Sequence, residues 1–239
     1  MEPRDARRKP RVTVVIAVFN MESHLAATLD SVRAQHFRDW ETVIVDDAST
    51  DSSSAIARSY CEVDSRFRQV ILPINSGRPA VPRNVGVTEA HGEYVAFLDH
   101  DDLWHPAKLK RQVQALDRYP SMGMVHSHLW VKRNNMSIWG LLYLPSPYRS
   151  IASHERLMHK NLIQCSSALV RTDVLRSVGP FREDLELRTV EDYELWFRIS
   201  QHFSIGFVSE IHGTYRIHAM GASSNERVQE RLARLDKEV

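Results

Sequence analysis

The sequence predicts an α/β protein built on a doubly wound, mostly parallel central sheet with helices on both faces. Apolar, β-branched runs alternate with helical segments up to residue 118, and this alternation is typical of parallel sheets. The run at residues 94–98 is apolar throughout, as in a strand covered on both faces. With 239 residues, 43% of them hydrophobic, the chain is long enough to bury such a core.

The first half of the chain reads as four strand-then-helix units. Strands are expected at residues 12–19, 40–45, 70–72 and 94–98. Helices are expected at residues 22–35, at 52–60, in a short segment that ends near residue 91, and from Pro106 onward. Beyond residue 118 the pattern is less regular. It indicates strands at 122–132 and just after 165, and a helix with one apolar face at 190–203, so we interpret this half as a recognition surface.

Net charge, cysteine spacing and the length of the apolar stretches restrict the possible functions of the protein and its location in the cell. A formal net charge of +1 argues against a dedicated nucleic-acid binder. Cys61 and Cys165 lie far apart without metal-ligand spacing, which favours reduced packing residues over a disulfide or a zinc site. We expect residues 1–11 to form a basic, flexible tail without the apolar h-region of a secretory signal peptide after it, and no apolar stretch reaches the length of a membrane span. We therefore expect a cytoplasmic protein, with at most weak peripheral contact of the tail with anionic lipid at the inner face of the membrane.

Three carboxylates at the end of an apolar strand need a physical reason. Asp99, Asp101 and Asp102 follow residues 94–98 directly, at the edge where open α/β sheets bind ligands. Crowded carboxylates repel one another unless a cation lies between them, and Mg²⁺ or Mn²⁺ prefers oxygen ligands. The alternative is a solvated acidic turn before the next helix, and these residues alone do not separate the two. Because the chain has neither G-x-G-x-x-G after its first strand nor G-x-x-x-x-G-K-[ST], a glycine-rich phosphate loop is excluded.

Five spaced motifs resemble one family. The segments VTVVIAVFN, VIVDDASTD, NSGRPAVPRNVGVTEAHGEYVAFLDHDD, VGPFREDL and VEDYELWFRI together resemble the family 2 glycosyltransferases with the GT-A fold. The resemblance covers nearly the whole chain. It implies a nucleotide-sugar donor, a divalent metal and inversion at the anomeric carbon. It also implies a single GT-A domain, with a donor-binding half at 12–118 and an acceptor-binding and catalytic-base half at 119–239.

The resemblance assigns a nucleotide site to the first half. Asp47 matches the contact to the nucleobase, and a carboxylate accepts well from the imide N–H of uracil. Its alternative is a turn or helix-cap role of the kind expected for neighbouring aspartates. Val18 and Asn20, at the end of the first strand, belong to the same site. Arg83 is placed to meet a phosphate, and its alternative is a surface ion pair.

The metal site also follows from the resemblance. Asp99 and Asp101 match a D-x-D pair, in which Asp101 is the better candidate for direct ligation and Asp99 lies toward the ribose. His218 matches a position close to the diphosphate and the metal, although a structural histidine is equally compatible with the sequence. The expected cofactor is Mn²⁺ or Mg²⁺.

A catalytic base is expected in the second half. Asp192 matches the base of the E-D motif, and Glu191 is the fallback. The alternative is a capping box formed by Thr189 and Asp192, and a helix N-terminus would lower the pKa of Asp192.

We therefore expect an inverting glycosyltransferase that acts in polysaccharide or glycoconjugate synthesis. UDP-sugars are the first expected donors and dTDP-sugars the second, and the acceptor is a hydroxyl of a glycan, a lipid-linked glycan or a small molecule. Two other classes stay open: a metal-dependent phosphohydrolase with Asp99 as nucleophile and Asp101 as acid, and a binding module without activity.

Overall fold

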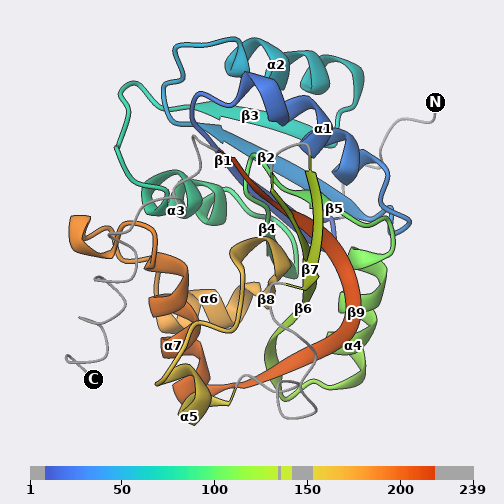
Figure 1. Ribbon diagram of the computed structural model, residues 1–239, viewed down its shortest axis with the longest axis vertical. Helices are drawn as coiled ribbons and strands as arrows, with labels where there is room; N and C mark the ends of the chain where they lie inside the picture. Colours follow the sequence, from blue (N-terminus) through green and yellow to red (C-terminus); the bar gives the residue numbers. More distant parts are fainter. Residues whose placement is uncertain (1–8, 134–135, 142–152, 219–239) are drawn as a thin grey trace.

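The computed structural model describes residues 9–133, 136–141 and 153–218 and shows helices packed around a nine-stranded sheet (Figure 1). The strands are β1 (Val12–Val18), β2 (Trp40–Asp46), β3 (Phe67–Ile71), β4 (Tyr94–Phe97), β5 (Leu103–Trp104), β6 (Met122–Arg133), β7 (Met136–Leu141), β8 (Leu169–Arg171) and β9 (Ser204–Ile217). The α-helices are α1 (Glu22–Arg33), α2 (Ser53–Val63), α3 (Ala80–Thr88), α4 (Lys108–Arg118), α5 (His154–Leu157), α6 (Thr172–Val178) and α7 (Glu191–His202). Short 3-10 turns lie at Cys165–Ser167 and Leu185–Leu187.

The sheet is mostly parallel, as the sequence predicts. Its strands follow the order β3-β2-β1-β4-β8-β6-β9-β5, and β7 pairs with β6. The block β3-β2-β1-β4 is parallel throughout, and β6 and β9 run in the same direction as that block. The strands β5, β7 and β8 run in the opposite direction. The carboxyl ends of β1, β2, β4 and β9 therefore lie toward the same edge of the sheet.

Helices cover both faces of the sheet and create two hydrophobic cores. The first core is formed with α1, α2 and α4, and the second with α3, α5, α6 and α7. In Figure 1, α1 and α2 lie above the sheet, α3 lies at the left at mid-height, and α6 and α7 lie below α3. The largest buried side chains include Trp40, Leu25 and Leu29 in the first core and Trp196, Phe97 and Phe181 in the second. Burying each such side chain contributes about 1.5–3 kcal/mol, so the two cores hold both layers against the sheet.

The four expected strand-then-helix units are confirmed, with ends that shift by a few residues. The long strand β9 and the short strand β5 were not predicted. The tail expected at 1–11 ends before Arg11, because this side chain forms ion pairs with Glu93 at 2.9 Å and with Asp117 at 2.7 Å. Residues 1–8 and most of the aromatic-rich segment at 137–150 lie outside the described residues. In the described part of the chain, no helix is long and apolar enough to cross a membrane.

Candidate active site

The acidic turn after β4 separates its three carboxylates. Asp102 is 1% exposed; one of its oxygens accepts the Ser166 hydroxyl at 2.5 Å and the other accepts the Arg216 N–H at 3.0 Å. Burial raises the pKa of Asp102 well above its usual range. Asp102 therefore fastens the turn to β9 and to the 3-10 turn at Cys165–Ser167, and it is not exposed to a ligand.

Asp99 is held by a buried arginine. Arg83, 7% exposed on α3, donates from Nη2 to Asp99 at 2.7 Å and from Nη1 to the Oε1 atom of Glu191. The helix approaches β1 closely enough for this because Gly86 has no Cβ; a Cβ there would lie 2.4 Å from Val15 Cγ1. The sequence left a surface ion pair as the alternative role for Arg83. The structure corrects this, because the ion pairs of Arg83 are buried. Its guanidinium joins the acidic turn to the E-D motif at the start of α7.

The carboxylate of Asp101 contacts the imidazole of His218, and the family resemblance assigns both residues to the metal site. The Oδ2 atom of Asp101 lies 2.8 Å from Nε2 of His218, just beyond the end of β9. Two ligands on adjacent corners of an octahedron with 2.1 Å bonds lie about 3 Å apart, so this pair fits Mn²⁺ or Mg²⁺. The structure does not bring Asp99 into the pair, and among the described residues no group of three or more His, Cys, Asp or Glu is arranged to hold a metal ion. Such cations are usually bound by one or two protein ligands, and phosphate oxygens of the substrate and water fill the remaining positions.

The carboxylate of Asp47 is buried and bonds to side-chain and backbone groups of the loop before α3. Its carboxylate accepts the Ser76 N–H at 2.9 Å, the Ser76 hydroxyl at 2.8 Å and the Asn75 amide at 3.1 Å. The turn roles suggested as its alternative belong to its neighbours: Asp46 accepts the N–H of Ser49 at 3.0 Å, and a second aspartate, at position 51, accepts that of residue 53. Asp47 therefore ties β2 to the loop before α3 instead of forming a local turn.

Val18 and Asn20 end the first strand in different ways. Val18 is 1% exposed and packs in the first core, and its carbonyl accepts the N–H of Asp47 at 2.8 Å. Asn20 has a positive φ of 45° and accepts the N–H of Thr50 at 2.8 Å. The side chain of Val18 is thus enclosed, while Asn20 connects the ends of β1 and β2.

Asp192 lies in the first turn of α7 beside the Arg83 ion pairs. The capping box is not formed: Val190 precedes the helix, Thr189 has a φ of 80°, and its hydroxyl has no partner in the described part of the structure. Burial first, and the neighbouring Glu191 charge second, raise the pKa of Asp192 to about 7, against the opposing effect of Arg83. The lowered pKa expected from the helix N-terminus is thus corrected to a raised one.

Glu191 is less suited to act as a base. One of its oxygens is held by Arg83, and the other is buried without a partner among the described residues. Asp192 is only partly buried, and the bond it accepts, from the N–H of Tyr193 at 2.7 Å, uses a single oxygen.

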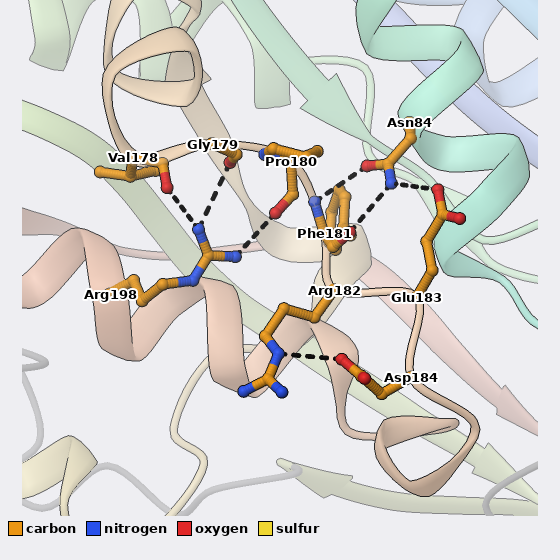
Figure 2. A pocket seen from close by; sticks show the side chains of 9 residues that line it. All are labelled: Asn84, Val178, Gly179, Pro180, Phe181, Arg182, Glu183, Asp184 and Arg198. Atoms are coloured by element: carbon orange, nitrogen blue, oxygen red, sulfur yellow. Dashed lines mark hydrogen bonds and ion pairs between the residues drawn. The ribbon is translucent and has the colours of Figure 1, made fainter.

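The loop between α6 and α7 is fixed from both sides (Figure 2). Asn84, next to Arg83, accepts the N–H of Phe181 and donates to its carbonyl, each at 2.9 Å. Arg198 of α7 donates to the carbonyls of Val178 at 2.5 Å and Pro180 at 2.7 Å. These residues line a shallow hollow of about 500 Å³ whose polar groups largely bond one another. The loop that precedes the E-D motif is therefore anchored to α3 as well as to α7.

Comparison with known proteins identifies the family of the chain. The family model of Glycosyl transferase family 2 matches residues 13–179 of the chain. The chain belongs to glycosyltransferase family 2. EpsE of Bacillus subtilis (strain 168), a candidate glycosyltransferase, is 30% identical over 199 residues, which are 83% of this chain and 68% of EpsE. TuaG of the same organism, a candidate teichuronic acid biosynthesis glycosyltransferase, is 27% identical over 219 residues, which are 91% of this chain and 83% of TuaG.

Solved structures confirm the GT-A fold of this family 2 member. S. aureus TarS 1-349 in complex with UDP-GlcNAc superposes with a TM-score of 0.76 at 22% identity, covering 94% of this chain and 65% of that one. Mannosyltransferase PcManGT from Pyrobaculum calidifontis, in complex with GDP-Man and Mn²⁺, gives 0.70 at 22% identity, covering 91% and 60%. The chain thus spans less than two thirds of either solved structure. As a family 2 glycosyltransferase it is an enzyme, and the phosphohydrolase and binding-module alternatives are set aside.

Sequence reasoning missed several residues that build this site. Arg216 and Ser166 hold Asp102, and Asn84 anchors the loop of residues 178–184. A signal for Arg216 was present, because the segment at 204–217 is rich in β-branched and aromatic residues and contains no proline. Nothing local distinguished Ser166, whose partner is 64 residues away in the chain.

Proposed function

We propose that this glycosyltransferase moves a sugar from a nucleoside diphosphate donor to a hydroxyl acceptor with inversion, and that UDP-sugars are its donors. The observation that carries the proposal is the buried Arg83, whose ion pairs with Asp99 and Glu191 link the acidic turn to the start of α7. This link supports a site in which Asp192, next to Glu191, acts together with the Asp101–His218 pair of the same turn.

The donor site is assigned by its chemistry. Asp101 and His218 would hold the cation, and an imidazole ligand suits Mn²⁺ better than Mg²⁺. When bound, this cation would offset the negative charge that develops on the leaving diphosphate. Asp47 would accept the imide N–H that uracil and thymine share, so dTDP-sugars are the second choice. The UDP-GlcNAc complex of TarS and the GDP-Man and Mn²⁺ complex of PcManGT support a metal-dependent nucleotide-sugar donor.

The base is assigned by elimination among the carboxylates. Arg83 engages Asp99 and Glu191, whereas Asp192 keeps an oxygen free of hydrogen bonds within the described structure. A carboxylate whose pKa lies near 7 is well matched to accept a proton at neutral pH.

The transfer is then a single displacement. Asp192 takes the proton of the acceptor hydroxyl as the acceptor oxygen bonds to the anomeric carbon. The bond from that carbon to the diphosphate oxygen breaks, and the nucleoside diphosphate leaves with the electron pair. One base without a protein nucleophile inverts the anomeric configuration.

The names of the relatives support a broad class of acceptor and no particular molecule. TuaG is named for teichuronic acid biosynthesis, which supports a role for this chain in polysaccharide or glycoconjugate synthesis. The acceptor would be a hydroxyl of a glycan, free or lipid-linked.

The test begins with a donor screen and ends with the product. Thermal shift of the purified protein with a panel of nucleotide sugars, with and without Mn²⁺, identifies the donor, since a ligand that binds the folded state raises Tm. With that donor, Asp192→Asn should bind normally and lose turnover by about 10²-fold or more. The matched control is Asp184→Asn, which removes the charge of an exposed aspartate paired with Arg182 and should leave turnover unchanged. Proton NMR of the first-formed product should show a β linkage from an α donor. An α linkage, or an Asp192→Asn variant with wild-type turnover, would overturn the mechanism.

A further inference from the structure

A second histidine lies against the proposed metal ligand. His24, in the first turn of α1, stacks on His218 with ring centroids 4.7 Å apart and an interplanar angle of 22°. Offset stacking of this kind fixes the plane of one ring relative to the other. Neither the family motifs nor the acidic turn includes His24.

His24 is itself held in place by its surroundings. Its Nδ1 atom lies 2.6 Å from the Ser23 hydroxyl, and its backbone carbonyl accepts Nη2 of Arg216 at 3.5 Å. Arg216, two residues before His218, donates to Thr28 Oγ1 at 3.0 Å. The end of β9 is thus docked on the first turns of α1, and the two imidazoles are brought together by contacts that do not depend on a cation.

The contact with Asp101 alone does not define the orientation of the His218 ring. A single Nε2 to Oδ2 contact at 2.8 Å leaves the ring free to turn about that axis. Metal-bound histidines normally donate their other ring N–H to an acceptor that fixes the ring, and loss of that partner typically weakens metal binding by 10- to 100-fold. A stacked ring would constrain the plane of His218 in a comparable way. The stack on His24 is the aromatic contact of His218 in the described structure.

We propose that His24 is a positioning residue of the metal site, holding the His218 imidazole so that Nε2 faces the Asp101 carboxylate and a divalent cation bound with a nucleoside diphosphate. This inference rests on the proposed function of the same site. The role needs the flat face of the His24 ring and not its nitrogens.

The experiment compares two substitutions at position 24. Mn²⁺ is titrated into the full chain with saturating UDP, and free Mn²⁺ is followed by electron paramagnetic resonance. His24→Ala removes the ring and should raise the Kd for Mn²⁺ by about tenfold or more. His24→Phe keeps a flat ring for stacking and should stay within about threefold of wild type. Asp101→Asn serves as the control in which binding is lost, and melting temperatures with EDTA show that each variant is folded.

Each outcome has a separate meaning. A His24→Ala variant with wild-type Mn²⁺ affinity would overturn the positioning role. A His24→Phe variant as weak as His24→Ala would also overturn it, because a ring nitrogen would then be required and His24 would be a direct ligand. If the folded wild-type protein shows no Mn²⁺ binding with UDP, the proposed metal-dependent function itself fails.

Discussion

Removal of the Arg83 guanidinium should destabilise the protein strongly. In Arg83→Met the side-chain volume is nearly kept, but Asp99 and Glu191 lose the cation between them, and the Arg83 and Glu191 side chains are only 9% and 4% exposed. Breaking a buried pair by removing one partner costs about 3–5 kcal/mol. A loss of 1 kcal/mol lowers Tm by about 2–4 °C in a chain of this size, so we expect Tm to fall by about 6–20 °C.

Calorimetric melting of the wild-type and Arg83→Met proteins measures the effect. Arg33→Met is the matched control, since Arg33 pairs with Asp30 at 2.8 Å on the surface, with side chains 49% and 52% exposed. Exposed pairs of this kind contribute about 0.5 kcal/mol or less, so Tm should change by no more than about 2 °C. If Arg83→Met melts as close to wild type as Arg33→Met does, the guanidinium does not hold the two motifs together.

Three further predictions concern the reaction. With saturating Mn²⁺, kcat/KM should fall about tenfold per unit below pH about 7, because Asp192 must be deprotonated to act as a base and its pKa is raised to about 7; a flat profile from pH 5.5 to 8 would contradict this. Asp101→Asn should fold normally but lose the Mn²⁺-dependent part of UDP binding in calorimetry, since a neutral amide is a poor ligand for a hard cation; unchanged affinity would place the cation elsewhere. Asp47→Ala should raise the Kd for UDP more than it lowers turnover at saturating donor, because the contact is present equally in the ground and transition states; a collapse of turnover at constant KM would exclude the nucleobase role.

Local patterns predicted the first half of the fold well. The runs that become β1, β2 and β4 are recognisable because buried parallel strands are apolar at nearly every position. The strand β9 was missed because it mixes apolar with polar residues such as Glu210 and His212, and it pairs with β6 over a long and irregular register. Its place between β6 and β5 is a tertiary property that no short segment contains.

The sequence resemblance assigned Asp101 and His218 to one site, and the structure brings the two side chains into contact. Their roles as metal ligands stay a prediction. The resemblance could not show that Arg83 is buried between two carboxylates, because burial depends on how closely α3 packs on β1. For the same reason it gave the wrong direction for the pKa of Asp192, where desolvation and the Glu191 charge outweigh the helix N-terminus.

The position of His218 has a consequence for how the protein matures. Asp101 and His218 are separated by 117 residues, and the strand that carries His218 to the site inserts between β6 and β5. During synthesis the chain leaves the ribosome from its N-terminus, so β1 to β4 and their helices can pack while β9 is still inside the tunnel. A nascent chain at that stage has the acidic turn but not its histidine. If Asp101 and His218 hold the cation as we propose, the cation site would be complete only after β9 has inserted.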